Sequence, residues 1–343
     1  MLLGQGPARS EYLACAGFST PFVVVYPWTV AGGFGAKFSN PATLPAGSAQ
    51  GQLSFHPAGT SLAVAHSTTP FVTAYPWSSS GFGTKYANPS VLPVDDCRAC
   101  AFSPAGTEIA VMNYTLSPYI NAYGWSSGFG TKFSDPGTLP AGGGFSIAFN
   151  PLGNALAIAH NTSPFVTAYA WSASGFGAKF SNPGTLPAGA GQAVAFSPAG
   201  TEIAVCHNTT PFISAYPWSG AGFGTKLSNP ASLPAGVAVA GGLNFSPNGN
   251  YLALAHNTSP YVEVYPWSSS GFGTKFSNPG TLPTGTGYSV AFSAASTTIF
   301  VGHATSPNIT AYPWSALGFG TKYSDPATLP GGVVAGFSFA SIP

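Results

Sequence analysis

The sequence contains very little charge. Only 5% of its 343 residues are Asp, Glu, Lys or Arg, against about 25% in an average soluble domain, and the formal net charge is +1. Nucleic-acid binding without sequence preference depends on clustered Lys and Arg, which neutralise phosphates. We therefore expect no nucleic-acid partner.

Long apolar runs are also missing. No stretch reaches the roughly 18 to 20 uninterrupted apolar residues of a membrane-spanning helix, because 44 Gly and 33 Pro divide the chain into short pieces. The first residues lack the cationic start and apolar core of a secretory signal. We expect neither membrane insertion nor a signal peptide.

Cysteine is scarce as well. Four cysteines, scattered along the chain, are too few for a disulfide framework. Cys97 and Cys100 form a C-x-x-C pair, but no second pair and no βαβ context accompany it. We interpret both as ordinary strand residues, and we predict no cofactor.

What the sequence does have is a repeat. Apolar residues make up 45% of the chain and aromatic residues 14%, which is ample material for a core. One phrase returns seven times, in repeats of about 47 to 49 residues, and its tryptophans lie 46 to 49 residues apart. A period in the forties, filled with short strands and turns, is typical of a β-propeller in which each repeat forms one blade. The tryptophans are Trp28, Trp77, Trp125, Trp171, Trp218, Trp267 and Trp314.

Each repeat contains four strand-like segments. In one repeat they cover residues 192–196, 202–207, 212–218 and 223–228, with turn residues between them. The sequence therefore predicts an all-β fold, a seven-bladed propeller with four antiparallel strands per blade, and a single domain over residues 1–343. Residues 335–343 match an innermost strand and stop, so we expect the N- and C-terminal strands to close the ring within one blade.

Alternation along the strands predicts how the blades pack. Tyr75 and Trp77 point to one face of their strand, whereas Val72 and Ala74 point to the other. The bulky face of one blade can then fit against the small face of the next. The outermost segment of every repeat carries one lysine, which we interpret as protection against edge-to-edge pairing rather than as a ligand-binding ring.

The repeat resembles known families in two ways. The succession V-A-F-S-P-x-G, I-A-V-A, a four-residue turn and a Y-x-W strand end resembles WD40-like propellers over almost the whole chain, although Tyr-Pro-Trp stands where Trp-Asp is expected. The phrase Y-P-W-S-x-x-G-F-G-T-K-F-S-N-P-x-T-L-P resembles repeats of uncharacterised tailed-bacteriophage proteins. This second resemblance implies a component of a virion, made in the host cytoplasm, with other virion proteins as partners and a host-surface glycan or receptor as a further possibility.

Several repeated residues are candidates for a site. Five histidines share one position near a turn proline, and we interpret them as buried between blades and bonded to turn backbone rather than as metal ligands. Three Asn-Thr-Ser/Thr-Pro sequences fit a glycosylation acceptor but fit a β-turn better. The repeated tryptophans suit burial between blades better than a sugar-stacking platform. The histidines are His66, His160, His207, His256 and His303, and the asparagines are Asn161, Asn208 and Asn257.

The acidic residues do not form an obvious catalytic pair. The eight acids occupy scattered repeat positions, and only Asp95 and Asp96 are adjacent. Together with Arg98 they form the one cluster of charge, which we interpret as a solvated loop or, alternatively, as a partner contact. We predict no catalytic residues and no metal site.

These observations lead to a prediction of function. We predict a non-enzymatic structural or adhesion component of a bacteriophage virion, acting as a protein–protein interaction scaffold in host attachment. The alternative is a glycan-binding propeller lectin with repeated weak sites. An enzyme with a site in the central channel is the third hypothesis, and the apolar innermost strands argue against it.

Overall fold

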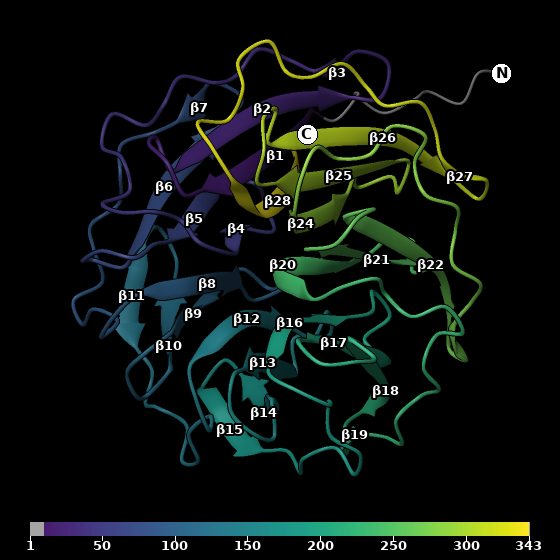
Figure 1. Ribbon diagram of the computed structural model, residues 1–343. Coiled ribbons are helices and arrows are strands. Elements are labelled where there is room, and N and C mark those ends of the chain that lie inside the picture. Colours follow the sequence, from purple (N-terminus) through teal and green to yellow (C-terminus); the bar gives the residue numbers. More distant parts are fainter. Residues whose placement is uncertain (1–9, 343) are drawn as a thin grey trace, which may run out of the picture.

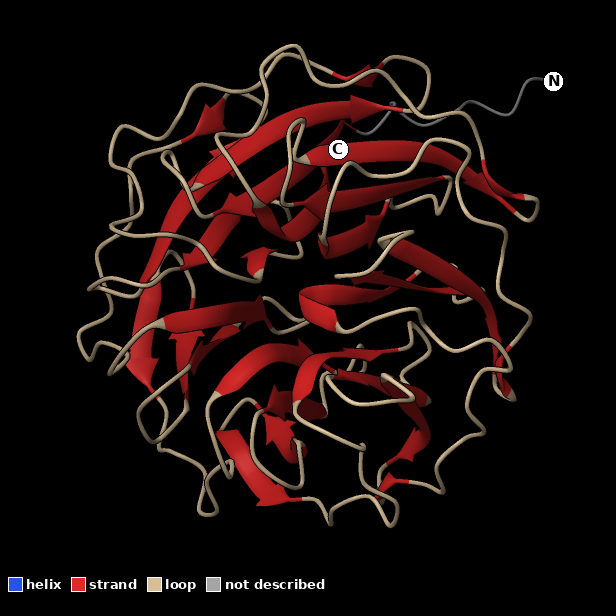
Figure 2. Ribbon diagram, viewed as in Figure 1, coloured by secondary structure: helices blue, strands red, loops and turns tan. Residues whose placement is uncertain are grey.

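Seven small sheets stand in a ring around a central axis (Figures 1 and 2). The computed structural model describes residues 10–342, and every sheet in that range has four antiparallel strands. No helix occurs between residues 10 and 342, and hence none that is long and apolar enough to cross a membrane. The predicted all-β, seven-bladed propeller is confirmed.

The strands of each blade follow one another from the axis outward. Blade 1 contains β28 (Val334–Ile342), β1 (Ser10–Gly17), β2 (Val23–Thr29) and β3 (Gly33–Phe34), and blade 2 contains β4 (Leu53–Phe55), β5 (Ser61–Ala65), β6 (Val72–Ser78) and β7 (Gly81–Phe82). Blade 3 contains β8 (Cys97–Phe102), β9 (Glu108–Asn113), β10 (Ile120–Trp125) and β11 (Phe129–Lys132), and blade 4 contains β12 (Gly144–Phe149), β13 (Ala155–His160), β14 (Val166–Ser172) and β15 (Gly175–Lys179). Blade 5 contains β16 (Gly191–Phe196), β17 (Glu202–His207), β18 (Ile213–Ser219) and β19 (Gly222–Phe223), and blade 6 contains β20 (Ala238–Phe245), β21 (Tyr251–His256), β22 (Val262–Ser268) and β23 (Gly271–Phe272). Blade 7 contains β24 (Gly287–Phe292), β25 (Thr298–His303), β26 (Ile309–Ser315) and β27 (Gly318–Phe319).

The two ends of the described chain close the ring. β28 pairs antiparallel with β1, from Ser10 opposite Ile342 to Gly17 opposite Val334. The C-terminal strand thus supplies the innermost strand of the blade that the N-terminal strand begins (Figure 1). The predicted closure is confirmed for residues 10–342, while residues 1–9 and 343 lie outside the described range.

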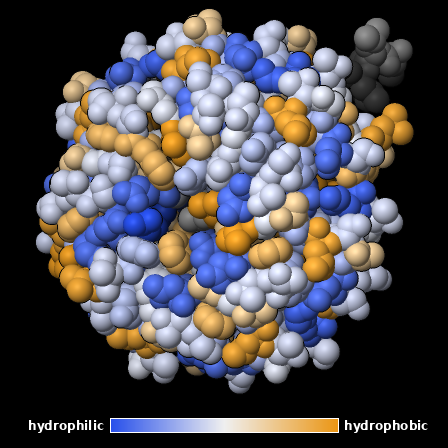
Figure 3. Space-filling model, in the orientation of Figure 1, coloured by the Kyte–Doolittle hydropathy of each residue, from blue (hydrophilic) through white to orange (hydrophobic). Residues whose placement is uncertain are grey.

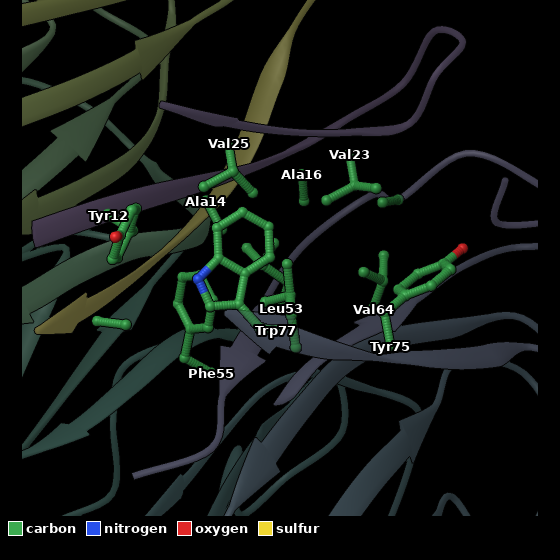
Figure 4. Packing of buried hydrophobic residues seen from close by; sticks show 13 residues of the cluster. Tyr12, Ala14, Ala16, Val23, Val25, Leu53, Phe55, Val64, Tyr75 and Trp77 are labelled. Carbon is green, nitrogen blue, oxygen red and sulfur yellow. The ribbon is translucent and has the colours of Figure 1, made fainter. Parts of the chain in front are cut away.

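The blades pack bulky face against small face, as the alternation predicts. At the boundary between blades 1 and 2, Trp77 of blade 2 lies beside Ala14 and Val25 of blade 1, and Tyr75 belongs to the same buried cluster (Figure 4). The opposite face of β6 joins a different cluster, in which Val72 and Ala74 meet blade 3. Filling the space between blades in this way leaves few voids, and a large side chain lost from it costs about 3 to 5 kcal/mol.

The outermost strands are shorter than predicted. In blade 5 regular pairing covers only Gly222–Phe223, where the sequence predicted residues 223–228. Beyond it, two isolated bonds hold the chain to β18, from Gly224 N to Pro217 O (2.8 Å) and from Leu227 N to Ala215 O (2.8 Å). Pro217 lies on the edge of β18 that faces this segment and has no N–H to donate, so the regular hydrogen bonding between β18 and β19 stops there.

The repeated lysines have a common partner. Six of them donate from Nζ to an Asn or Asp three residues later, and so anchor the segment after the outer strand. The pairs are Lys37 with Asn40, Lys85 with Asn88, Lys132 with Asp135, Lys179 with Asn182, Lys226 with Asn229, and Lys322 with Asp325. Lys275 instead donates to Glu263 Oε1 (2.7 Å).

Candidate functional site

The innermost strands surround a channel whose two ends differ in chemistry. Figure 3 shows one face of the ring, hollowed near its centre, with polar and apolar residues interspersed. A cavity of about 420 Å³ lies where β8, β12 and β16 end, and the aromatic residues Phe102, Phe149 and Phe196 line it. Gln52 and Asn244 contribute its polar side chains. This volume falls within the range of about 300 to 1,000 Å³ that small-molecule sites occupy.

Gln52 ties three blades together beside this channel. Its backbone N–H donates to Arg98 O (3.0 Å), and Cys100 N donates to its carbonyl (3.3 Å). Its side-chain Oε1 accepts from Ile147 N of blade 4 (2.9 Å). Between blades 4 and 5, Ser146 Oγ accepts from Val194 N of blade 5. The Gln52 side chain makes the equivalent bond to blade 4, for which it reaches past blade 3.

The opposite end of β8 carries the charged cluster. β8 starts at Cys97, opposite the last residue of β9, so Arg98 and Phe102 lie towards opposite ends of the channel. Arg98 Nε donates to Asp96 Oδ2 (2.9 Å), and about a fifth of each side chain is exposed (22% and 21%). The guanidinium carbon lies 4.1 Å from the centroid of the Tyr114 ring.

Two neighbours hold this arrangement in place. Asp95 Oδ2 accepts from the backbone N–H groups of Thr115 and Leu116 (2.7 and 2.6 Å), which fixes the turn that carries Tyr114. The Tyr114 ring also packs on Phe145 of blade 4, with ring centroids 5.2 Å apart. One oxygen of the Asp95 carboxylate, Oδ2, is therefore used by the turn.

The Nη groups of Arg98 make no hydrogen bond to the part of the chain that the structure describes. Within residues 10–342 the guanidinium donates only from Nε, and Arg98 is the only arginine in that range. The seven lysines lie in the outermost segments of the blades, where they bond to nearby side chains. Arg98 is thus the cation that the described chain offers near the axis, with Asp96 beside it.

The repeated histidines do not take part in this site. All five are fully buried, and in four blades Nε2 lies within hydrogen-bonding distance of a hydroxyl on the next strand, for example 2.9 Å from Thr73 Oγ1 to His66 Nε2. His303 Nδ1 also lies 2.8 Å from Thr305 O in the turn, and the backbone of the equivalent turn threonine, Thr68, Thr162, Thr209 or Thr258, acts on each of the other four rings, as predicted. Burial lowers the pKa of His66, His160, His207 and His303 to about 4, which leaves these rings neutral at pH 7.

Blade 6 replaces the hydroxyl with a carboxylate. Glu263 is buried, 3.7 Å from His256 Nε2, and pairs with the partly exposed Lys275. Burial lowers the pKa of His256, while the charge of Glu263 opposes that shift. Within the described residues no three His, Cys, Asp or Glu side chains gather as metal ligands would.

The remaining candidate residues lie in structural positions. Burial raises the pKa of Cys97, and it raises that of Cys100 to about 12, so both are thiols rather than reactive thiolates. Asn161, Asn208 and Asn257 accept hydrogen bonds from the threonine that follows each of them in the turn.

All seven tryptophans are buried between blades. They are between 1% and 7% exposed, and each makes edge-to-face contacts with neighbouring aromatic rings. Trp77, for example, meets Phe82 at 5.0 Å and Phe55 at 5.6 Å between ring centroids. An indole face that is covered in this way is not available to stack on a sugar.

The fold is shared with proteins of very different sequence. No family model matches the chain, and no curated protein matches it. A periplasmic gluconolactonase from Pseudomonas aeruginosa is 18% identical, with 97% of this chain and 100% of that one covered and a TM-score of 0.73. A proposed 6-phosphogluconolactonase from Bacteroides fragilis is 11% identical over 99% and 100% of the chains (TM-score 0.77), and a Lactobacillus plantarum protein is 15% identical over 98% and 100% (TM-score 0.72).

These findings contradict the predicted function. The neighbours that are named for an activity are lactonases, and none of the three is named as a phage protein or a WD40 protein. The predictions of a non-enzymatic virion component in host attachment, and of a lectin as its alternative, are therefore wrong. The physical reason is that the phrase behind them, with its Tyr, Trp and Gly-Phe-Gly, encodes the packing of blades, which is independent of what the ring does.

Proposed function

We propose that this protein is a hydrolase of small lactones, with its active site at the end of the channel that carries Asp96 and Arg98. The observation that carries the proposal is this ion pair. It places a carboxylate beside a guanidinium with free Nη groups, at the start of an innermost strand. The shared fold of two proteins named as lactonases supports the reaction class.

The pair can serve both halves of a lactone hydrolysis. Water adds to the lactone carbonyl carbon, and Asp96 accepts the proton that the water loses. The Nη groups of Arg98 donate to the carbonyl oxygen, which becomes an oxyanion in the tetrahedral intermediate. When that intermediate collapses, the ring C–O bond breaks and the departing alkoxide takes the proton from Asp96, which yields the hydroxy acid.

The surrounding residues keep the guanidinium in one orientation. Asp96 binds Nε and the Tyr114 ring covers one face, while the Nη groups have no partner among residues 10–342. A guanidinium that is already oriented loses less freedom when it binds the oxyanion. Removing one oxyanion donor from a hydrolase typically slows kcat by about 10² to 10³.

The test is the rate of lactone hydrolysis above the spontaneous rate. D-glucono-1,5-lactone and δ-valerolactone serve as a polar and an apolar substrate, with proton release as the readout. We expect turnover by the unmodified protein and a loss of about 10² to 10⁴ in kcat for Asp96→Asn, as for other general bases.

Asp135→Asn is the matched control, since Asp135 pairs with Lys132 in the outermost segment of the same blade. We expect it to keep full activity. Hydrolysis no faster than in buffer for both lactones, or full activity in Asp96→Asn, would contradict the proposal.

A further inference from the structure

The cavity at the other end of the channel is a separate feature from the charged pair. Pro104 and Pro151, in the turns that follow β8 and β12, lie at its border, whereas Asp96 precedes β8. Gln52 lines the cavity with its side chain, and its backbone N–H is bonded to Arg98 O. Gln52 therefore contacts both ends of the channel, but uncharged residues line the cavity while an ion pair lies at the other end.

No charged side chain lines the cavity. Of its eleven lining residues, only Gln52 and Asn244 have polar side chains. Gln52 Oε1 is used by Ile147 N, which leaves its Nε2 hydrogens without a partner among residues 10–342. The half-buried Asn244 carboxamide likewise makes no hydrogen bond within that range, so one acceptor and two donors are free.

The rest of the wall is apolar and flat. Ala148 and Ala195 present methyl groups at equivalent positions of β12 and β16. Phe149 and Phe196 lie beside them, their rings packed edge to face on Trp171 and Trp218, 5.1 Å between centroids in both pairs. These packed rings cannot turn to make room for a longer ligand, so the shape of the cavity is set by the blades.

We propose that this cavity binds a small, neutral, cyclic polyol. A charged ligand would lose water without gaining an ion pair, which disfavours anions and cations alike. A purely apolar ring would leave the Gln52 and Asn244 carboxamides unpaired. A ring that carries hydroxyl groups satisfies both amides and lays its C–H face on the apolar wall at Ala148 and Ala195. The site does not depend on lactone hydrolysis.

Three probes of similar size test the proposal. We would measure the binding of myo-inositol, myo-inositol 1-phosphate and cyclohexanol to the full-length protein by titration calorimetry and saturation-transfer NMR. We expect myo-inositol to bind and each of the other two to bind at least tenfold more weakly. Equal or tighter binding of the phosphate or of cyclohexanol, or no binding of myo-inositol, would overturn the proposal.

Two variants place the binding in the cavity. Ala195→Phe fills it, and Asn244→Leu removes a carboxamide at nearly constant volume; we expect each to weaken myo-inositol binding at least tenfold. Gln192→Leu is the matched control, because it removes an amide from the opposite end of the same strand as Ala195. Thermal melting identifies any variant that fails to fold. If Ala195→Phe does not fold, the affinity of Asn244→Leu for myo-inositol is the deciding measurement. Unchanged affinity in a folded Asn244→Leu protein would refute the site, while Asp96→Asn should bind myo-inositol normally.

Discussion

Blades 3 and 5 are built from the same repeat but differ at the end of the channel where the proposed site lies. Blade 5 follows the common phrase, with Gln192 near the axis and a buried pair of His207 and Ser214. At the corresponding positions blade 3 has Arg98 and a pair of asparagines, Asn113 and Asn121, joined at 3.0 Å. The aromatic packing between blades is kept, so the difference concerns the ends of the strands, where Asn113 and Asn121 are themselves buried.

Blades 3 and 5 also differ in the length of their outermost strands. β19 in blade 5 has two residues, whereas β11 in blade 3 has four. Gly124 in blade 3 and Ala170 in blade 4 stand where the other five blades have proline, and β15 in blade 4 has five residues. One proline per repeat, through its missing N–H, therefore sets the length of the outermost strand.

The largest effect should be the same in both blades. Trp218→Ala in blade 5 and Trp125→Ala in blade 3 each remove a buried ring that contacts Phe223 or Phe129, so we expect each to lower the free energy of unfolding by about 3 to 5 kcal/mol. Urea unfolding measures the change, and Ser219→Ala on the exposed end of β18 is the control. A loss in blade 5 more than twice that in blade 3 would show that the cores are not equivalent.

The second effect separates the blades by pH. The pKa of His207 is about 4 in the folded chain and ordinarily 6.5, so between these values the unfolded chain binds more protons. Stability is complete above pH 6.5 and falls as the pH drops towards 4, for His207 and for the three histidines like it. At about 1.4 kcal/mol per pH unit, His207 by itself contributes a loss of about 3 kcal/mol as the pH falls from 6.5 to 4, and each of the other three contributes a similar loss.

A variant that copies blade 3 tests this difference. His207→Asn with Ser214→Asn removes one titrating group, so its free energy of unfolding should fall less between pH 6.5 and 4 than that of the unmodified chain. Denaturant unfolding at a series of pH values measures the slope. An unchanged slope would mean that the burial of His207 does not govern the pH dependence.

A third, smaller effect concerns activity alone. Tyr114→Leu removes the ring beside the Arg98 guanidinium, an interaction worth about 0.5 to 2 kcal/mol, so we expect kcat for lactone hydrolysis to fall by no more than about thirtyfold. Asn208 occupies the corresponding position in blade 5, and Asn208→Leu should leave the rate unchanged. Equal loss in both variants would indicate a general effect of the turns.

The smallest effect concerns the outer strand. Pro217→Ala restores an N–H in blade 5, so β19 should lengthen towards the four residues of β11. The bond gained, about 0.5 to 1.5 kcal/mol, is offset by the extra freedom of the unfolded chain, about 0.4 to 1 kcal/mol. Slower hydrogen exchange at residues 224–226, with little change in stability, is the expected result; exchange as fast as before would contradict the role of the proline.

The sequence predicts some parts of the candidate site and misses others. Asp95, Asp96 and Arg98 stand out as the one charged cluster, but their roles differ because Asp95 is used by the turn after β9. Tyr114 follows Asn113, which stands where five other repeats have histidine, and nothing local indicates that Tyr114 lies beside Arg98. Gln52 and Asn244 carry no signal at all, because a single amide in a strand is ordinary.

The repeat by itself determines the ring. Seven copies of a repeat of about 47 residues set seven blades, and the twofold alternation of large and small side chains sets which face of one blade meets which face of the next, because both depend only on spacing along the chain. Only the tertiary structure decides that Gln52 reaches Ile147, 95 residues away, and that Tyr114 covers Arg98. Those contacts form because closure of the ring brings the ends of different strands together. No local sequence pattern encodes the distance between residues on different strands.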